Sequence, residues 1–240
     1  MRNAEKRKHF AGGEMLVWLE LDGEGRSNVD SGLKILDDML SLMIAQANFD
    51  LVVKNSGKYS NQYKIAEAVG KGLGEAYAES LSGGDRIKGN GSTIFPVEDA
   101  LIMTAVDLSG QGVLSYDLKF PTEKVEDFDT ETMEIFLLSF VKAAGLTLHI
   151  YQISGHNSYT VLIGAFRSLA QTLQTASEQI PATADRVERQ GNDSTEEKKS
   201  LGLENTLLPE EMQRKETAEE EERDNSSNEI EKELRKRGLL

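Results

Sequence analysis

The stretch Leu148-His-Ile-Tyr-Gln-Ile-Ser-Gly155, together with the helical pattern at residues 158–177, decides the fold because an earlier part of the chain repeats it. Asp50-Leu-Val-Val-Lys-Asn-Ser-Gly57 precedes a second helical pattern, at residues 63–81, in the same way. Each copy reads as a strand that ends at Ser-Gly and is followed by a helix, and the helices align at an offset of 96 residues. A recurrence of this kind indicates a duplicated unit.

Apolar spacing predicts the other elements around these two copies. We expect strands at residues 14–21, 49–54, 101–108, 112–120 and 146–153, and helices at residues 31–47, 63–81, 130–144 and 158–177. This order predicts an α+β fold of tandem duplicated βαβ-type halves, with helices packed on one face of each sheet.

Composition narrows the function classes. The chain has 240 residues, 41 acidic and 27 basic side chains, a net charge of -14, no cysteine and three histidines. These counts exclude disulfide scaffolds and Cys-ligated metals, and the acidity argues against strong direct binding of nucleic acid. Neither a membrane span nor a signal peptide is predicted, so we expect a cytoplasmic protein that binds no membrane.

We divide the chain into four segments. A basic, flexible N-terminus is expected at residues 1–13, the two halves at 14–90 and 91–182, and an acidic tail with a short C-terminal helix at 183–240. The tail has 17 acidic and 11 basic residues and no aromatic residue. Such a composition buries too little apolar surface to offset the entropy of ordering, so we expect the tail to be disordered.

The tail also holds the residues that we expect to contact a partner. An acidic segment can occupy a basic channel built for nucleic acid, and a short helix with apolar residues four apart can pack on another protein. The alternative is that the acidic block only keeps the chain soluble. The candidate interaction residues are Glu219, Glu220, Glu221, Glu222, Asp224, Ile230 and Leu234.

Ten short motifs occur in the order found in imidazoleglycerol-phosphate dehydratases. They include Leu21-Asp-Gly-Glu-Gly25, Pro96-Val-Glu-Asp-Ala-Leu101, Asp107-Leu-Ser-Gly110 and Phe166-Arg-Ser-Leu-Ala170, and the resemblance covers residues 14–181. The resemblance implies a ribosomal protein S5 domain 2-like fold and assembly from trimers. It also implies manganese held by clustered His and Glu, for the elimination of water from a histidine-biosynthesis intermediate.

The positions that the resemblance assigns to metal ligands mostly carry other residue types. They are Asp38, Gln46, Tyr63, Lys64, Glu67, His149, Tyr159, Thr160 and Ile163. A dinuclear centre needs several imidazoles and carboxylates converging on it, so we expect no metal, no cofactor and no catalytic residue. We interpret His149 as a core or interface residue rather than a remaining ligand, and Glu67 as part of a solvated ion pair with Lys64 or Lys71.

Positions that the resemblance assigns to the substrate also differ. The phosphate-binding end of the family, Ser-Thr-Lys-Gly, corresponds to Ala182-Thr-Ala-Asp185, which exchanges a cation for an anion near the expected phosphate. Two arginine positions of the family are Gly89 and Gln111 in this chain. These differences agree with the expectation of lost chemistry.

Three functions remain open from the sequence. The first is a non-catalytic accessory or scaffold subunit, a pseudoenzyme whose core docks on a larger protein and whose tail modulates a nucleic-acid-processing partner, such as a DNA polymerase holoenzyme in DNA replication. The second is a pseudoenzyme partner or regulator of an active imidazoleglycerol-phosphate dehydratase in histidine biosynthesis. The third, an enzyme with altered chemistry, has no candidate constellation. Homo-oligomers and hetero-oligomers are both compatible with the sequence.

Overall fold

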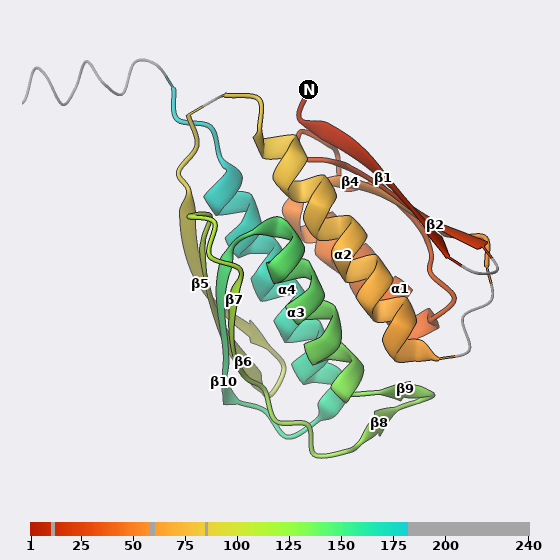
Figure 1. Cartoon of the computed structure of the whole chain (residues 1–240). Coiled ribbons are helices and arrows are strands. Elements are labelled where there is room, and N and C mark those ends of the chain that lie inside the picture. Colours follow the sequence, from red (N-terminus) through yellow and green to blue (C-terminus); the bar gives the residue numbers. More distant parts are fainter. Residues whose placement is uncertain (11–12, 58–60, 85, 182–240) are drawn as a thin grey trace, which may run out of the picture. The chain divides into compact units, whose positions relative to one another are not determined.

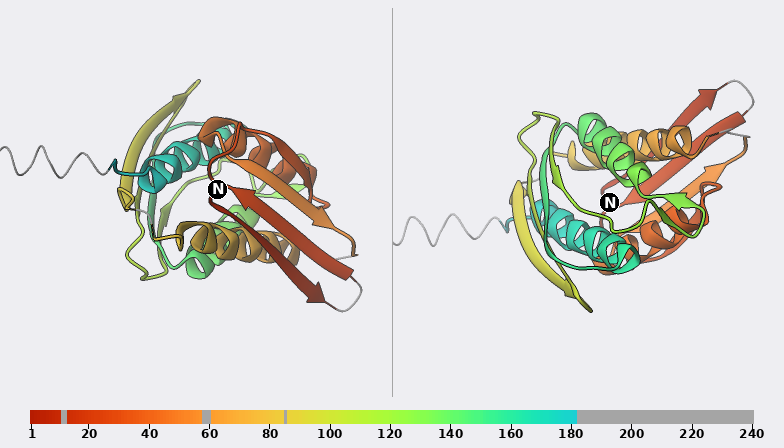
Figure 2. Two further views of the ribbon diagram at one scale, coloured as in Figure 1. Left: turned by 90° about the horizontal axis from the view of Figure 1, so that it is seen from above. Right: turned by 90° about the horizontal axis from the view of Figure 1, so that it is seen from below.

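In the part of the chain that the computed structural model describes, four helices lie between two four-stranded sheets (Figures 1 and 2). The structure describes residues 1–181 apart from 11–12, 58–60 and 85. Met1–Pro181 forms one compact unit. The helices pack on one face of each sheet, as predicted, which makes the fold an α+β duplication.

The first half forms one sheet and two helices. In chain order they are β1 (Asn3–Phe10), β2 (Gly13–Glu20), β3 (Ser27–Asp30), α1 (Lys34–Ala47), β4 (Asp50–Asn55) and α2 (Gln62–Leu81). The strand order is β1-β2-β4-β3, in which β3 and β4 are parallel and the other neighbours are antiparallel.

The second half repeats this topology with one insertion. Its elements are β5 (Asn90–Val97), β6 (Ala100–Asp107), β7 (Val113–Asp117), β8 (Lys124–Val125), β9 (Phe128–Asp129), α3 (Glu131–Ala144), β10 (Thr147–Ser154) and α4 (Ser158–Ser177). The order β5-β6-β10-β7, with a parallel β7–β10 pair, matches that of the first sheet. The β8–β9 hairpin is the insertion.

The N-terminal residues form a strand, which corrects the flexible basic end that we expected. β1 pairs with β2 along its length and corresponds to β5 of the second half, so the first half begins before residue 14. Lys8 Nζ lies 2.8 Å from Glu75 Oε1, and Lys6 pairs with Glu79 one turn further along α2. These ion pairs connect β1 to α2, so a strand with few apolar residues is still held in place.

One core joins the two halves because α2 packs directly on α3. A Cβ atom at Gly70 would lie 2.4 Å from the carbonyl oxygen of Phe136, and one at Gly74 would lie 2.4 Å from that of Phe140. Phe136 stacks on Phe140 and on Phe166 of α4, with ring centroids 6.5 and 5.5 Å apart. The halves are therefore two parts of one hydrophobic unit.

The acidic tail lies outside the described residues. The same holds for Thr183-Ala-Asp185 and for the candidate interaction residues Glu219, Glu220, Glu221, Glu222, Asp224, Ile230 and Leu234. In the part of the chain that the structure describes, no helix is long and apolar enough to cross a bilayer.

Candidate functional site

The starts of α2 and α4 are equivalent points of the duplicated fold, and both carry positions that the resemblance assigns to metal ligands. Asn61 Oδ1 accepts a hydrogen bond from the backbone N–H of Tyr63 at 2.7 Å, and Asn157 Oδ1 accepts one from Tyr159 at 2.8 Å. Identical Asn caps thus fix both helix starts. The backbone geometry of the repeat is kept, while of the ligand positions that follow the caps only Glu67 keeps a ligand residue type.

At the start of α2, the position of the first ligand carries a hydrogen-bond donor. The Tyr63 hydroxyl donates to Asp129 Oδ2 at 3.4 Å. Burial and the negative charge of Asp129 raise the pKa of Tyr63, so the phenol keeps its proton at neutral pH. Lys64 and Glu67 are exposed on the same helix.

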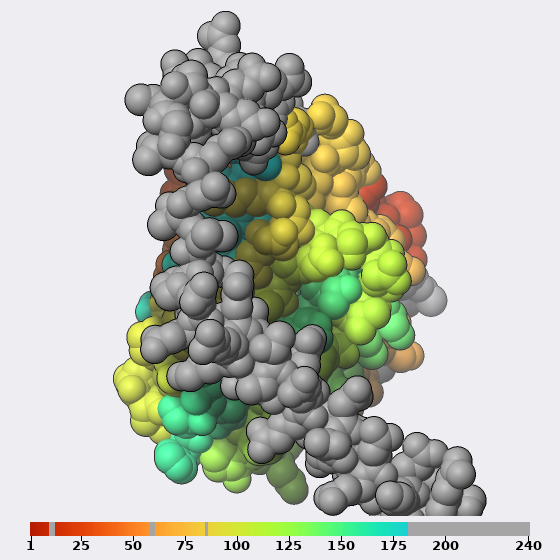
Figure 3. Space-filling model, turned by 90° about the vertical axis from the view of Figure 1, so that its left-hand side faces the viewer, coloured from red at the N-terminus to blue at the C-terminus, as the bar shows by residue number. Residues whose placement is uncertain are grey.

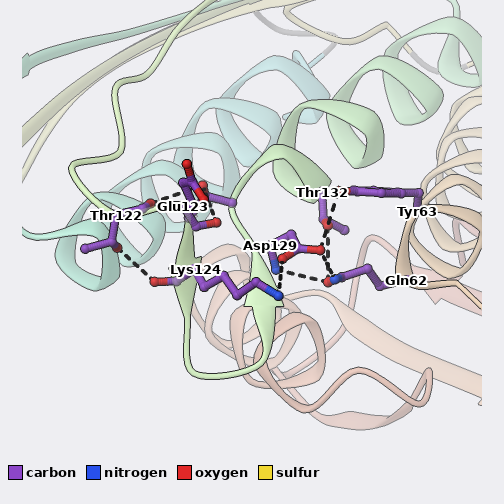
Figure 4. Close-up of polar contacts among 8 residues, drawn as sticks. Gln62, Tyr63, Thr122, Glu123, Lys124, Asp129 and Thr132 are labelled. Carbon is purple, nitrogen blue, oxygen red and sulfur yellow. Dashed lines mark hydrogen bonds and ion pairs between the residues drawn. The ribbon is translucent and has the colours of Figure 1, made fainter.

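Asp129 is the centre of a polar cluster that connects α2 with the β8–β9 hairpin and α3 (Figure 4). Lys124 Nζ lies 2.9 Å from Asp129 Oδ1, and the side-chain amide of Gln62 donates to Asp129 Oδ2. Gln62 Oε1 accepts from the backbone N–H of Asp129 at 3.0 Å and from Thr132 Oγ1 at 3.3 Å. Each of these groups has a protein partner.

At the start of α4, the equivalent positions also carry side chains that are not typical metal ligands. Tyr159 is 43% exposed, while Thr160 is buried and its hydroxyl donates to Asp99 Oδ1 at 2.8 Å. The backbone N–H of His156 donates to Asp99 Oδ2 at 2.6 Å. These two hydrogen bonds lower the pKa of Asp99. Ile163 is an apolar residue packed against the core.

Asp38 and Gln46, the two assigned ligand positions on α1, belong to no cluster of metal ligands within the described residues. Asp38 Oδ2 pairs with Lys34 Nζ at 3.0 Å, one helical turn away, and this pair raises the pKa of Lys34. Gln46 is half-buried near the end of the helix. Asp38 therefore already has a cation of the protein as its partner.

His149 lies on β10 and pairs with Ala105 of β6, and its side chain is on the opposite face of the sheet from the buried Leu148 and Ile150. Part of this second sheet forms the surface shown in Figure 3. His149 is exposed, so it is not a core residue in this chain.

The His149 ring stacks on Tyr151 with centroids 6.2 Å apart, and the Tyr151 hydroxyl lies 2.6 Å from Ser115 Oγ. Ile94 and Ile153, from the same sheet, are 60% and 54% exposed.

Two shallow depressions lie near these positions. One of about 360 Å³ lies between α2 and α3, and Glu67, Lys71 and Lys142 are among the residues that line it. The other, of about 340 Å³, is lined by Lys124, Tyr159 and neighbouring residues at the start of α4. Glu67 and Lys71 thus line the same groove, and the ion pair expected between Glu67 and a lysine of α2 stays a prediction.

The residues present do not fit the manganese that the resemblance implies. Within the described residues, no group of three or more His, Asp or Glu could hold a metal ion. A phenol, an ammonium, a hydroxyl and a hydrocarbon occupy helix-start positions where imidazoles and carboxylates would be needed. The nearby carboxylates of Asp38, Asp99 and Asp129 are engaged by donors of the protein itself.

Sequence reasoning missed Lys124 and Asp129. Both lie on the β8–β9 insertion, which breaks the repeat. Asp129 belongs to Phe128-Asp-Thr130, one of the ten motifs of the resemblance, but that motif was given no role in the site. The sequence shows only the insertion itself. More residues separate β7 from α3 in the second half than separate β3 from α1 in the first half. Extra residues at one point of a duplication often carry a specific role.

Comparison with known proteins gives a consistent family. The profile of imidazoleglycerol-phosphate dehydratase matches residues 31–173. The protein of that name from Prochlorococcus marinus (strain AS9601) is 32% identical over 188 residues, which cover 78% of this chain and 94% of the relative. The one from Cereibacter sphaeroides (strain ATCC 17029 / ATH 2.4.9) is 34% identical over 188 residues, covering 78% and 96%.

Solved structures agree with the fold. Imidazoleglycerol-phosphate dehydratase from Staphylococcus aureus subsp. aureus N315 superposes with a TM-score of 0.68 at 24% identity, covering 74% of this chain and 99% of that one. The Pyrococcus furiosus enzyme in complex with (S)-C348 gives a TM-score of 0.65 at 24% identity, covering 73% and 94%.

These matches correct our expectations of function. A non-catalytic scaffold, a pseudoenzyme and a role in DNA replication were wrong, because relatives aligned over nearly their whole length are named as dehydratases. The error arose from giving the replaced ligand positions and the tail charge more weight than the similarity of the whole folded unit. The chain belongs to the imidazoleglycerol-phosphate dehydratase family.

Proposed function

We propose that this chain acts at the imidazoleglycerol-phosphate dehydratase step of histidine biosynthesis, as a subunit of a dehydratase assembly. One observation carries the proposal: relatives of that name are 32% to 34% identical and are covered over 94% to 98% of their length. Fold alone would not support a function. Here the sequence similarity runs through both halves of the duplicated fold.

The metal-ligand residues that this chain offers favour one form of this role. The described residues include no group of three His, Asp or Glu that could hold a metal ion, so no step through manganese is derived for this chain. An assembly with a second family chain that supplies the metal ligands satisfies both the family similarity and the donor set. In that form, the chain takes part in the dehydratase step as one of two family chains in the assembly.

We place this role in the cytoplasm. The substrate named for the family is a phosphate ester, and a charged phosphate crosses a bilayer only at high energetic cost. A protein acting on it, or on its enzyme, works in the compartment where the ester is made.

Growth without histidine tests the proposed function. A host that lacks its dehydratase gene would receive this chain alone, an active dehydratase alone at limiting expression, or both. We expect the chain to restore growth by itself or to change the growth rate when it is co-expressed. Growth that is the same with and without the chain in both settings would overturn the proposal.

A matched control excludes effects of expression. The Gly74→Leu variant would place a side chain where a Cβ atom already lies 2.4 Å from the Phe140 carbonyl oxygen, so α2 and α3 could not pack. This variant, produced from the same vector, should not reproduce the effect of the native chain.

A further inference from the structure

Strand β5 forms one edge of the second sheet and carries no charge. It pairs with β6 on one side, and no other strand of the described residues pairs with its other side (Figure 2). Its sequence, Asn-Gly-Ser-Thr-Ile-Phe-Pro-Val, contains no Asp, Glu, Lys or Arg. The equivalent edge strand of the first half, β1, contains Glu5, Lys6, Arg7 and Lys8. Charged side chains on an edge strand oppose pairing with another chain, so β5 lacks a protection that β1 has.

The free edge of β5 presents backbone groups at alternate residues. In an antiparallel pair, residues that direct their N–H and C=O groups toward the neighbouring strand alternate with residues that direct them away. The backbone N–H of Leu108 donates to the Gly89 carbonyl oxygen at 2.8 Å, and Val97 and Ala100 flank the two-residue turn between β5 and β6. The odd-numbered residues from 89 to 97 therefore face β6. The residues that face the free edge are Asn90, Ser92, Ile94 and Pro96.

The row of N–H donors at this edge has a defined start and end. Pro96 has no backbone N–H, and the N–H of Lys88 donates to the Glu178 carbonyl oxygen at 3.0 Å. Proline at an edge position of this kind leaves the pairing with β6 intact. Within the described residues, the N–H groups that β5 offers at its free edge thus belong to three alternate residues, and Ser92 is the middle one.

A second copy of β5, running antiparallel, matches this row residue by residue. When both strands are centred on Ser92, this serine lies opposite Ser92 of the second copy, and Asn90 lies opposite its Ile94. Each of these residues then donates its N–H to the other chain and accepts through its C=O. A two-fold axis through the centre relates the two copies, so the same surface of both chains makes the interface.

The charges at the two ends of β5 also favour the antiparallel arrangement. Arg86 and Lys88 precede the strand and are exposed, and Glu98, which follows it, is exposed as well. Lys88 pairs with Glu178 of its own chain, and Arg86 adds a second positive charge. Antiparallel pairing brings the basic start of each strand beside the acidic end of the other. Parallel pairing would place like charges side by side, which is destabilising.

We propose that two copies of this chain pair through β5, antiparallel and centred on Ser92, so that their second sheets form one continuous sheet across a two-fold axis. Backbone hydrogen bonds between the two strands supply the contact, and the opposite charges at the strand ends favour this register. The inference concerns contacts between copies of this chain, and it does not depend on the step at which the protein acts.

Cysteine cross-linking of the full-length protein tests the register. The chain has no cysteine, so Ser92→Cys introduces a single thiol. Opposite residues of a hydrogen-bonded antiparallel pair have Cα atoms about 5.5 Å apart, which a disulfide can span. We expect mild oxidation to convert most of the Ser92→Cys protein to a disulfide-linked dimer. Ser27→Cys, at an exposed serine of the edge strand β3, is the matched control and should run mostly as a monomer on a non-reducing gel.

A charge at the centre of the interface tests whether β5 holds the copies together. Ser92→Lys places two lysines opposite each other, so sedimentation equilibrium should give a dissociation constant about tenfold or more above that of the native protein. Because Ser92 is exposed, the circular dichroism spectrum should not change. Ser27→Lys should associate as the native protein does. Equal cross-linking of the two cysteine variants, or native association of Ser92→Lys, would show that β5 is not the interface.

Discussion

Asp50 fixes the loop between β2 and β3. Its Oδ1 accepts from the backbone N–H groups of Glu24 and Arg26 at 2.8 and 2.9 Å, and its Oδ2 accepts from the Arg26 guanidinium at 2.7 Å. Gly23 is required there, because a Cβ atom would lie 2.4 Å from the Asp50 backbone nitrogen. The Leu21-Asp-Gly-Glu-Gly25 motif therefore has a structural reason.

The same carboxylate makes stability depend on pH. Burial alone would raise the pKa of Asp50, but the Arg26 guanidinium and the backbone N–H groups outweigh it and lower the pKa to about 2. In the unfolded chain the pKa is about 3.9, so the unfolded state binds the proton first as pH falls. The contribution of Asp50 is thus complete above about pH 5 and is lost as pH falls from about 4 toward 2.

Asp50→Asn should therefore lower the free energy of unfolding by about 2 kcal/mol near neutral pH, where charge-assisted hydrogen bonds are lost. Urea unfolding at pH 7, 4 and 3 measures the difference from the native protein. We expect that difference to shrink at the lowest pH. Asp117→Asn, at an exposed aspartate, should change little; a loss of the same size would show that the burial of Asp50 is not the cause.

Individual residues also show how far the site could be predicted. The sequence identifies Tyr63, Lys64 and Tyr159 as replacements at ligand positions, but it does not reveal what they contact. Tyr63 contacts Asp129 and Thr160 contacts Asp99, and these two aspartates are distant in sequence and reach the helix starts only through tertiary packing. Short-range patterns carry no information on such contacts.

The α2–α3 contact is the closest approach between the two halves. Gly70 and Gly74 lie one turn apart on α2 and let its backbone reach the carbonyl oxygens of Phe136 and Phe140. Tyr77, one turn further, donates its hydroxyl to the carbonyl oxygen of Leu173 at 3.2 Å. Small residues on one helical face thus determine how the duplicated units pack.

Gly70→Ala should destabilise the protein by about 1–3 kcal/mol, since the added methyl overpacks the helix pair and outweighs the gain in helix propensity. The midpoint of urea unfolding measures the change. Gly83→Ala is the control, because a Cβ atom there meets nothing within 4 Å. Equal midpoints for the two variants would contradict the packing described for α2 and α3.

Each helix of the described residues could be predicted because its apolar face repeats with helical period. The strands β1, β3 and β5 could not, for a physical reason. β1 is rich in charged residues, and its Lys6 and Lys8 form ion pairs with α2. β5 alternates exposed and half-buried residues at a sheet edge. β3 has four residues, too few for a period to show. Edge strands depend on their neighbours more than on their own sequence.

The molecule as a whole explains why function was harder to predict than fold. Replaced ligand positions and a charged tail are local features, and each suggested a function outside the family. Similarity to the relatives instead extends over 78% of the chain and nearly all of their length. The duplicated sheets, the shared core and this similarity agree with one another, whereas the local features say only how this member differs.

The most direct test of the proposed role is the dehydration of imidazoleglycerol phosphate, measured with purified full-length protein alone and titrated into a family dehydratase from the same cell. We expect product formation to depend on the chain in at least one of these settings, and to saturate near equal amounts of the two proteins if they assemble. Rates that are unchanged by the chain in both settings would contradict a role at the dehydratase step.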